Sequence, residues 1–193
     1  MPRTESGLIL ASASPRRLEL LRQVGFEPVV APAAIDETPL PAEQSAAYVV
    51  RIAGDKAAAL AAQYPMAVVL AADTTVVVDG QMLHKPADEA AALAMLQQLS
   101  GREHLVLTAV CIRRGDWQRQ QLVSTEVRFR PLSQAEMKAY AATGEPMDKA
   151  GAYAIQGRAA LFVSQLRGSY SAVVGLPLCE TAMLLQEAGL QPW

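Results

Sequence analysis

Apolar positions along the chain alternate between short continuous runs and stretches of helical periodicity. The run Leu8–Ala11 has the length of a strand, after which Leu18, Leu21 and Val24 recur at helical spacing until Gly25. This order predicts a strand, a loop and a helix.

A longer helix and a buried strand follow. Apolar residues at i, i+3, i+4 and i+7 predict a helix over about Ala42–Gln63, with Lys56 on or beside its apolar stripe. The run Ala67–Ala72 is continuously apolar, as in a strand covered on both faces, and we expect it to end at Asp73. Thr75–Val78 continues in extended form.

The second half of the chain repeats this alternation. We expect a helix after Ser133, where Ser133 and Glu136 form a capping-box pattern, and a last helix from Pro177 to Gly189. The other expected elements are a short strand at Glu27–Ala31, a helix at Asp88–Leu99, a hairpin of Glu103–Arg113 and Gln118–Arg130, and strands at Leu161–Leu166 and Ala172–Val174. Together these elements predict an α/β fold in one domain spanning residues 1–193.

Composition narrows the class of protein. The chain has 193 residues, of which 51% are hydrophobic, 19% charged and 5% aromatic, so we expect a globular protein whose core uses Leu, Val, Ile and Ala without aromatic stacking. A formal net charge of −2 favours neither a nucleic-acid polymer nor a membrane surface as partner. Cys111 and Cys179 lack the spacing of a zinc site, and the apolar part of Met1–Leu10 is too short for a signal peptide. We therefore expect a cytoplasmic protein.

Polar residues gather where the first strand meets its helix. Ser12, Ser14, Arg16 and Arg17 surround Pro15, which suits the first position of a helix because proline has no N–H to leave unpaired. Hydroxyls, free amides and guanidinium groups at a helix N-terminus make an anion site. The alternative is a capped helix with two solvated arginines.

A second group of polar residues lies around Asp73. A carboxylate that follows a buried strand is placed as a general base or metal ligand, although an aspartate there can also simply cap a turn. Lys85 could bring a cation to the same place or remain on the surface.

Two further segments combine glycine with polar residues. Residues 145–157 include Gln156 and several small residues, which suits a backbone that approaches a ligand closely. Ser169 and Ser171 do not have the GxSxG spacing of a serine hydrolase, and the chain contains neither a P-loop nor a GxGxxG motif.

In this order the motifs resemble the Maf family of nucleoside triphosphate pyrophosphatases. The resemblance runs from Leu10 to about Thr181 and implies a mixed twisted sheet with flanking helices, in two lobes around a central cleft, as in Maf and ITPase-like proteins. Its motifs are LASASPRR at 10–17, IDE at 35–37, RIAGDKA at 51–57, AADTTVV at 71–77, HKP at 84–86, LSG at 99–101, DKAGAYAIQG at 148–157 and GSYSAVVGLPL at 168–178.

The resemblance also implies an activity: hydrolysis of a nucleoside triphosphate between its α- and β-phosphates, with a divalent cation such as Mg²⁺ or Mn²⁺. Matching the motifs places the acidic catalytic residue on Asp73 and metal binding on Glu37 and Asp73. Phosphate binding falls on Ser12, Arg17, Lys56 and Lys85, and base selection on Arg16, Thr74 and Gln156. The last three are similar to the branch that acts on dTTP and UTP in the house-cleaning of nucleotide pools, and a homodimer is compatible with the family.

Two alternatives remain open at this stage. The same fold could hydrolyse another or a modified nucleoside triphosphate, or the chain could be a non-enzymatic regulator of septum formation. A binding module would not need the carboxylate of Asp73 beside a triphosphate, which favours the enzyme.

Overall fold

The computed structural model describes residues 7–192. The first six residues of Met1–Leu10, on which part of the signal-peptide argument rested, lie outside that range. Within it, no helix is both long and apolar enough to cross a membrane. The chain divides into two compact units. It passes from one unit to the other after residues 73, 107 and 123, each inside a long strand, and again after Val174.

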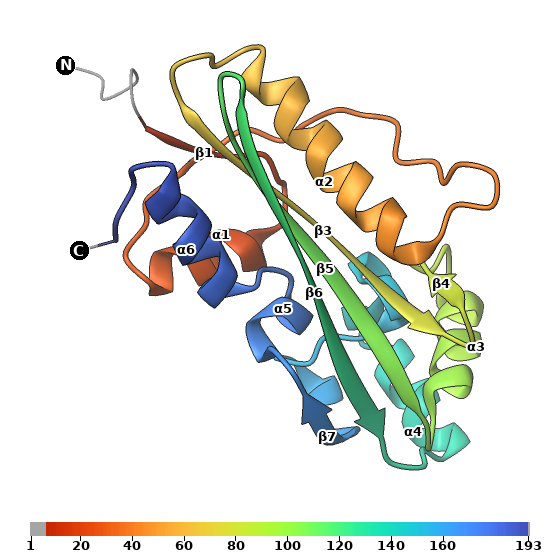
Figure 1. Ribbon diagram of the computed structural model, residues 1–193. Helices are drawn as coiled ribbons and strands as arrows, with labels where there is room; N and C mark the ends of the chain where they lie inside the picture. Colours follow the sequence, from red (N-terminus) through yellow and green to blue (C-terminus); the bar gives the residue numbers. More distant parts are fainter. Residues whose placement is uncertain (1–6, 193) are drawn as a thin grey trace. The chain divides into compact units, whose positions relative to one another are not determined.

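Among the described residues, seven strands form one mixed sheet in the order β2-β1-β3-β5-β6-β7, with β4 paired to β3 beside this path (Figure 1). The strand β1 runs parallel to both β2 and β3, whereas β4 pairs antiparallel with β3 and β7 antiparallel with β6. The strands are β1 (Leu8–Leu10), β2 (Val29–Val30), β3 (Val68–Val78), β4 (Gln81–Leu83), β5 (Glu103–Arg114), β6 (Trp117–Phe129) and β7 (Val163–Arg167). The predicted mixed α/β fold is thus confirmed. The central cleft and the single domain over 1–193 stay predictions.

The first unit holds residues up to 73, 108–123 and those from 175 onward. Its helices are α1 (Pro15–Gln23), α2 (Ser45–Ala61) and α6 (Leu178–Glu187). Ser14 is the N-cap residue of α1 and Pro15 its first helical residue, as predicted, but the Ser14 side chain makes no capping hydrogen bond. Its backbone N–H instead donates to Ser12 Oγ at 3.2 Å.

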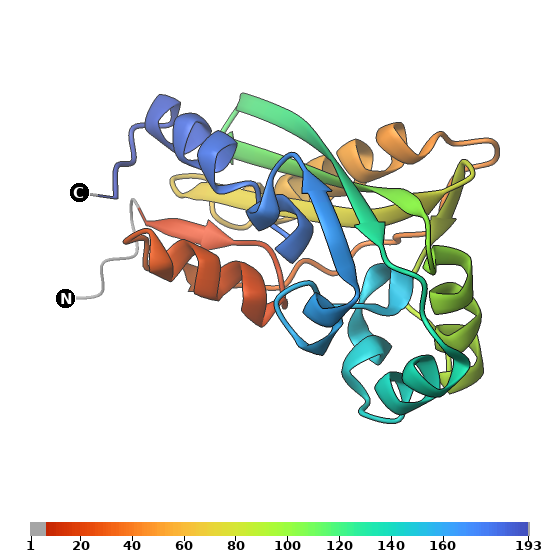
Figure 2. The same ribbon diagram turned by 90° about the horizontal axis from the view of Figure 1, so that it is seen from below.

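The second unit holds residues 74–107 and 124–174. Its helices are α3 (Glu89–Leu99), α4 (Gln134–Ala141) and the short α5 (Tyr170–Val174), with 3-10 helices at Glu145–Asp148, Ala150–Ala152 and Arg158–Leu161 (Figure 2). The capping box predicted before α4 is confirmed, because Ser133 Oγ accepts from the Glu136 N–H and Glu136 Oε2 accepts from the Ser133 N–H.

Two sequence-based predictions about these elements are wrong. The strand that starts at Val68 does not end at Asp73: the segment Thr75–Val78, which is extended as predicted, belongs to the same strand, and its three valines pair with β4. Ala172–Val174 is not a strand but part of α5, since Ser169 Oγ accepts from the Ala172 N–H at 3.2 Å and starts a helical turn there.

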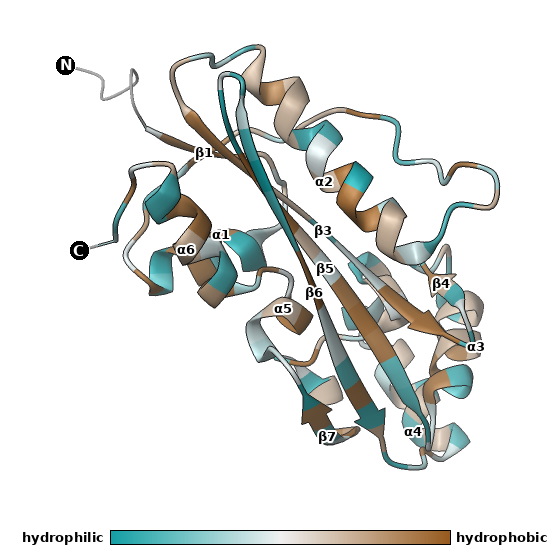
Figure 3. Cartoon of the chain, viewed as in Figure 1, coloured by the Kyte–Doolittle hydropathy of each residue, from teal (hydrophilic) through white to brown (hydrophobic). Residues whose placement is uncertain are grey.

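Hydropathy follows burial along the long strands. In Figure 3, much of β3 and β5 is apolar whereas β6 alternates with polar residues. Every residue of β3 except Thr74 is buried, while β6 keeps exposed positions over most of its length. The continuous apolar pattern of residues 67–72 therefore predicted its burial correctly.

The expectation of a core without aromatic stacking is wrong for the second unit. Phe129 packs edge to face against Tyr153 and His104, with ring centroids 4.8 Å and 5.1 Å apart, and Phe162 packs likewise against Tyr140 at 5.1 Å. Although aromatic residues are few, these converge in one buried cluster, so the overall percentage could not reveal it.

One glycine in this unit is required by both its backbone and its surroundings. Gly151 has φ +70°, and a Cβ there would lie only 2.7 to 2.9 Å from the side chain of Val76 on β3. Its N–H also donates to the carbonyl of His84 at 3.3 Å. The segment that leads to Gln156 is therefore packed against β3 without a side chain between them.

We predict that Gly151→Ala destabilises the protein more than Gly80→Ala does. Gly80 has a similar φ of +77° but nothing within 4 Å of the Cβ position, so it reports backbone strain alone. The extra overpacking against Val76 should lower the free energy of unfolding by a further ~1–3 kcal/mol, measured by urea denaturation. Equal losses in the two variants would contradict the close packing.

Candidate active site

The first unit contains a buried cation between two carboxylates. Lys56 Nζ on α2 lies 3.0 Å from Asp73 Oδ1 on β3 and 3.0 Å from Glu37 Oε1 in the loop before α2. The Lys56 and Asp73 side chains are each only 11% exposed, whereas Glu37 is 50% exposed. Lys56, Asp73 and Glu37, which lie far apart in the sequence, thus meet through ion pairs to Lys56 Nζ.

Burial and charge act in opposite directions on Asp73. Burial raises the pKa of its carboxyl above the ordinary value, while the ammonium of Lys56 and the guanidinium of Arg17 partly offset that rise. The nearby carboxylate of Glu37 adds to it. A carboxylate with a raised pKa is a stronger proton acceptor than an exposed aspartate, as a general base requires.

Arg17 is fixed beside this cluster by two hydrogen bonds. Its Nε donates to the carbonyl of Gly175 at 2.8 Å and its Nη1 to Ser12 Oγ at 3.0 Å. Burial lowers the pKa of Arg17, and Asp73 opposes that shift, but an arginine starts so high that it stays charged. Ser12, buried itself, therefore holds a permanent cation in place, as the predicted anion site requires.

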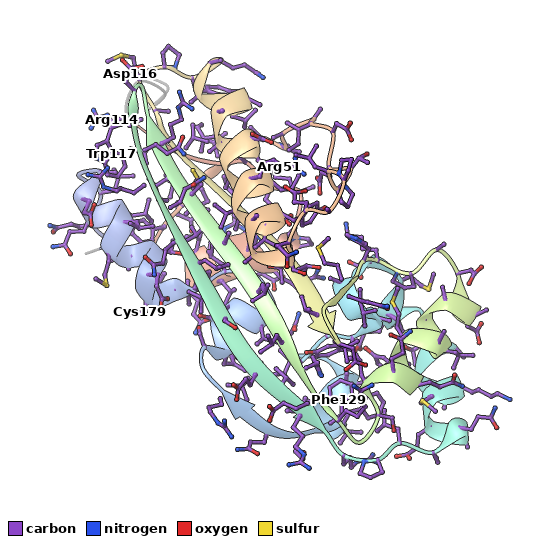
Figure 4. The ribbon with its side chains drawn as sticks, turned by 45° about the vertical axis from the view of Figure 1, so that its right-hand side comes forward. Arg51, Arg114, Asp116, Trp117, Phe129 and Cys179 are labelled. Carbon is purple, nitrogen blue, oxygen red and sulfur yellow. The ribbon has the colours of Figure 1, made fainter. Side chains whose placement is uncertain are left out.

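The loop that carries Glu37 is anchored by two residues of α2 that the sequence analysis did not identify. The Tyr48 hydroxyl donates to the Glu37 carbonyl at 2.9 Å, and Arg51 Nη2 donates to the Thr38 carbonyl at 3.2 Å. Arg51, labelled in Figure 4, also binds both carboxylate oxygens of Glu43. The spacing of Tyr48 eight residues before Lys56 could have placed both on one helix face.

The predicted site residues divide between the two units. Ser12, Arg16, Arg17, Glu37, Lys56 and Asp73 belong to the first unit, and Thr74, Lys85 and Gln156 to the second. In the second unit Thr74 is half-buried on β3, whereas Lys85 and Gln156 are exposed. The contact from Gly151 to His84 ties the segment before Gln156 to the residue before Lys85. That Arg16, Thr74 and Gln156 converge on one pocket stays a prediction.

The carboxylate oxygens of Asp73 and Glu37 are ligands of the kind that a hard divalent cation prefers. Asp73 and Glu37 each place a carboxylate oxygen against the same nitrogen, so these two oxygens are no further apart than twice that distance. No group of three or more His, Cys, Asp or Glu gathers as a metal site among residues 7–192. Mg²⁺ commonly takes one or two protein carboxylates and completes its shell with water and substrate phosphates, so this pair fits such an ion.

The fold and this cluster of charges agree with the family to which the chain is similar. The model of the family described as Maf-like protein matches residues 7–188, and the chain belongs to the Maf family.

Curated relatives are similar over nearly their whole length. A dTTP/UTP pyrophosphatase of Symbiobacterium thermophilum is 54% identical over 182 residues, which cover 94% of each chain. A dTTP/UTP pyrophosphatase of Aromatoleum aromaticum is 50% identical over 96% of this chain and 97% of its own. Among solved structures, a HAM1 protein from Coxiella burnetii matches with a TM-score of 0.48 and 15% identity, covering 94% of this chain and 98% of that one.

We predict that Arg17→Lys destabilises the protein although it keeps the charge. A lysine cannot donate to the Gly175 carbonyl and the Ser12 hydroxyl in the geometry of the guanidinium, and each hydrogen bond to a charged group contributes about 1.5–3 kcal/mol. Urea denaturation should show that the free energy of unfolding falls by an amount of that order. Arg22→Lys, on the same helix but exposed beside Glu27, is the control and should change the stability little.

Proposed function

We propose that this chain hydrolyses dTTP and UTP to the nucleoside monophosphate and pyrophosphate. The observation that carries the proposal is the buried ion pair of Lys56 and Asp73, which the half-exposed Glu37 joins and beside which Arg17 is fixed. It combines cations for phosphates with carboxylates for a metal ion or a water molecule. The dTTP/UTP pyrophosphatases that are 50% and 54% identical to this chain support the choice of substrate.

The cationic residues are the proposed phosphate site. A triphosphate carries about four negative charges, and preorganised positive groups stabilise the charge that develops when the anhydride breaks. Arg17 is held by Ser12 and Gly175 before any substrate arrives, so it need not reorganise. We assign phosphate binding to Ser12, Arg17, Lys56 and Lys85.

Asp73 is the proposed catalytic residue. Its carboxylate accepts a hydrogen bond from Lys56 and would take a proton from the attacking water. We assign metal binding to Glu37 and Asp73. A bound Mg²⁺ or Mn²⁺ would supply Lewis-acid stabilisation of the phosphate charge.

Base selection is the proposed role of Arg16, Thr74 and Gln156. The amide of Gln156 offers both a donor and an acceptor, which suits the O4 and N3–H edge of uracil and thymine. CTP presents the inverted pattern, and a site whose polar groups are left unpaired rejects the wrong base. We therefore propose that UTP and dTTP are preferred over CTP and over purine triphosphates.

The biological setting of this activity is also a proposal. House-cleaning of nucleotide pools, a cytoplasmic location, a single domain over 1–193 and a possible homodimer all rest on resemblance to the Maf family.

The experiment that tests the function is a hydrolysis screen over UTP, dTTP, CTP, ATP and GTP with Mg²⁺ or Mn²⁺. Products are separated by chromatography. We expect UMP and pyrophosphate from UTP, with kcat/KM for UTP and dTTP above that for the other nucleotides. UDP and orthophosphate as first products, or equal kcat/KM for UTP, CTP and GTP, would contradict the proposal.

Asp73→Asn is the matched control for the screen. The amide keeps the shape of the side chain but loses its charge, and removal of a general base costs about 10²- to 10⁴-fold in rate. A purified, folded Asp73→Asn variant that retains more than about a tenth of the wild-type rate would exclude a base role for Asp73.

A further inference from the structure

The turn that carries Gln156 is tight and its neighbours are buried. The Gly157 N–H donates to the Ala154 carbonyl at 3.0 Å, which closes a turn with Ile155 and Gln156 at its centre. Ile155 is 6% exposed and Ala154 5%, whereas the Gln156 side chain faces solvent. The exposed amide of Gln156 therefore stands on a fixed backbone.

One tyrosine of α4 holds the entry to this turn. The Tyr140 hydroxyl accepts the N–H of Ala154 at 3.2 Å and donates its own proton to Glu145 Oε1 at 2.9 Å. Tyr140 is 4% exposed, and burial raises the pKa of its hydroxyl, so it remains a neutral donor at any ordinary pH. A single hydroxyl thus joins α4, the turn and the next 3-10 helix.

The same carboxylate holds the exit from the turn. Glu145 Oε2 accepts the N–H of Arg158 at 3.2 Å, two residues after Gln156. The carboxylate fits there because Gly157 has no side chain: a Cβ at that position would lie 2.5 to 2.8 Å from the carboxyl group of Glu145. The absence of a side chain at Gly157 therefore serves this contact.

We infer that Tyr140 and Glu145 are positioning residues for base selection. Together they hold the backbone two residues before and two residues after Gln156, so the amide meets the base in one orientation. In Figure 2 the helix α4 and the segment that follows it lie side by side. The inference rests on the proposed role of Gln156 in reading the base, which it extends to two residues that need not touch the substrate.

If Tyr140 and Glu145 position Gln156, their removal should change the selectivity between nucleotides in a way that a loss of stability alone would not. Without the hydroxyl or the carboxylate, a backbone N–H of the turn loses its acceptor and the turn can shift. Because Gln156 would bind the base in both ground and transition states, the loss should fall mainly on KM for UTP. A less stable enzyme would instead lose active fraction, and its kcat would fall equally for all nucleotides.

The test compares kcat and KM for UTP and CTP in Tyr140→Phe, Glu145→Ala and Glu145→Gln. We expect the first two to lower the ratio of kcat/KM for UTP over CTP by about tenfold, since small misplacements of a positioned group have effects of this order or larger. Glu145→Gln should keep part of the ratio, because its amide oxygen can still accept from the Arg158 N–H, although its NH₂ cannot accept the proton of the Tyr140 hydroxyl.

Tyr153→Phe is the matched control. Tyr153 is as deeply buried in the same unit, and its hydroxyl contacts His104 Nε2 at 2.8 Å and not the backbone of the turn. It should lower the stability and leave the UTP-to-CTP ratio unchanged. Folded Tyr140→Phe and Glu145→Ala variants with the wild-type ratio, or a ratio that falls equally in Tyr153→Phe, would overturn the inference.

Amide hydrogen exchange separates failure of this inference from failure of the proposed function. We expect the N–H groups of Ala154 and Arg158 to exchange faster in Tyr140→Phe and Glu145→Ala, respectively, than in the wild type. If Gln156→Ala keeps the wild-type preference, Gln156 does not read the base, and both the proposed function of Gln156 and the positioning role fall. If Gln156→Ala abolishes the preference but the positioning variants do not, only the positioning role falls.

Discussion

Burial of opposite charges against each other is the constraint on which the first unit depends. An ammonium or a carboxylate withdrawn from water alone loses several kcal/mol of solvation, so the charges of Lys56 and Asp73 compensate each other. Their contact joins α2 to the middle of β3. Glu37, held by the hydroxyl of Tyr48, then completes the cluster from a loop. Such an arrangement adds little net stability, but it keeps charges ready in a place where they act strongly.

In the second unit, mainly neutral groups fix the backbone that carries Gln156. Its exposed Gln156 stands on a backbone that the hydroxyl of Tyr140 holds by a hydrogen bond. Gly151 and Gly157 allow this backbone to pack closely because they have no side chain, and a cluster of aromatic rings is buried in the same unit. The charged group in this arrangement is the carboxylate of Glu145, which accepts hydrogen bonds from Tyr140 and from the N–H of Arg158. Each unit thus contributes to both parts of the proposed reaction: Arg17 and Lys56 of the first unit join Lys85 of the second in phosphate binding, and Arg16 of the first joins Thr74 and Gln156 of the second in base selection.

Sequence patterns were informative where periodicity and burial coincide. The apolar run of residues 67–72 and the helical stripe that includes Lys56 predicted the two elements that meet at Asp73. They also predicted that Thr75–Val78 is extended, but not that it belongs to the same strand, because a charged residue inside a strand resembles the end of that strand until its partner is known. Glu37 was named only through the resemblance to the Maf family, and Tyr48 and Arg51 were not identified, because they hold its loop through side-chain contacts to backbone carbonyls, for which a single sequence has no periodic pattern. Ala172–Val174 shows the reverse problem, since a short apolar run does not distinguish a strand from a helical turn.

Carboxyl ¹³C NMR titration of Asp73 measures how its burial and the ammonium of Lys56 oppose each other. We expect the pKa of Asp73 to lie above that of an ordinary aspartate in the wild type, and to rise further in a folded Lys56→Met variant, which loses the opposing ammonium. An Asp73 pKa that is the same in the two proteins would contradict this expectation.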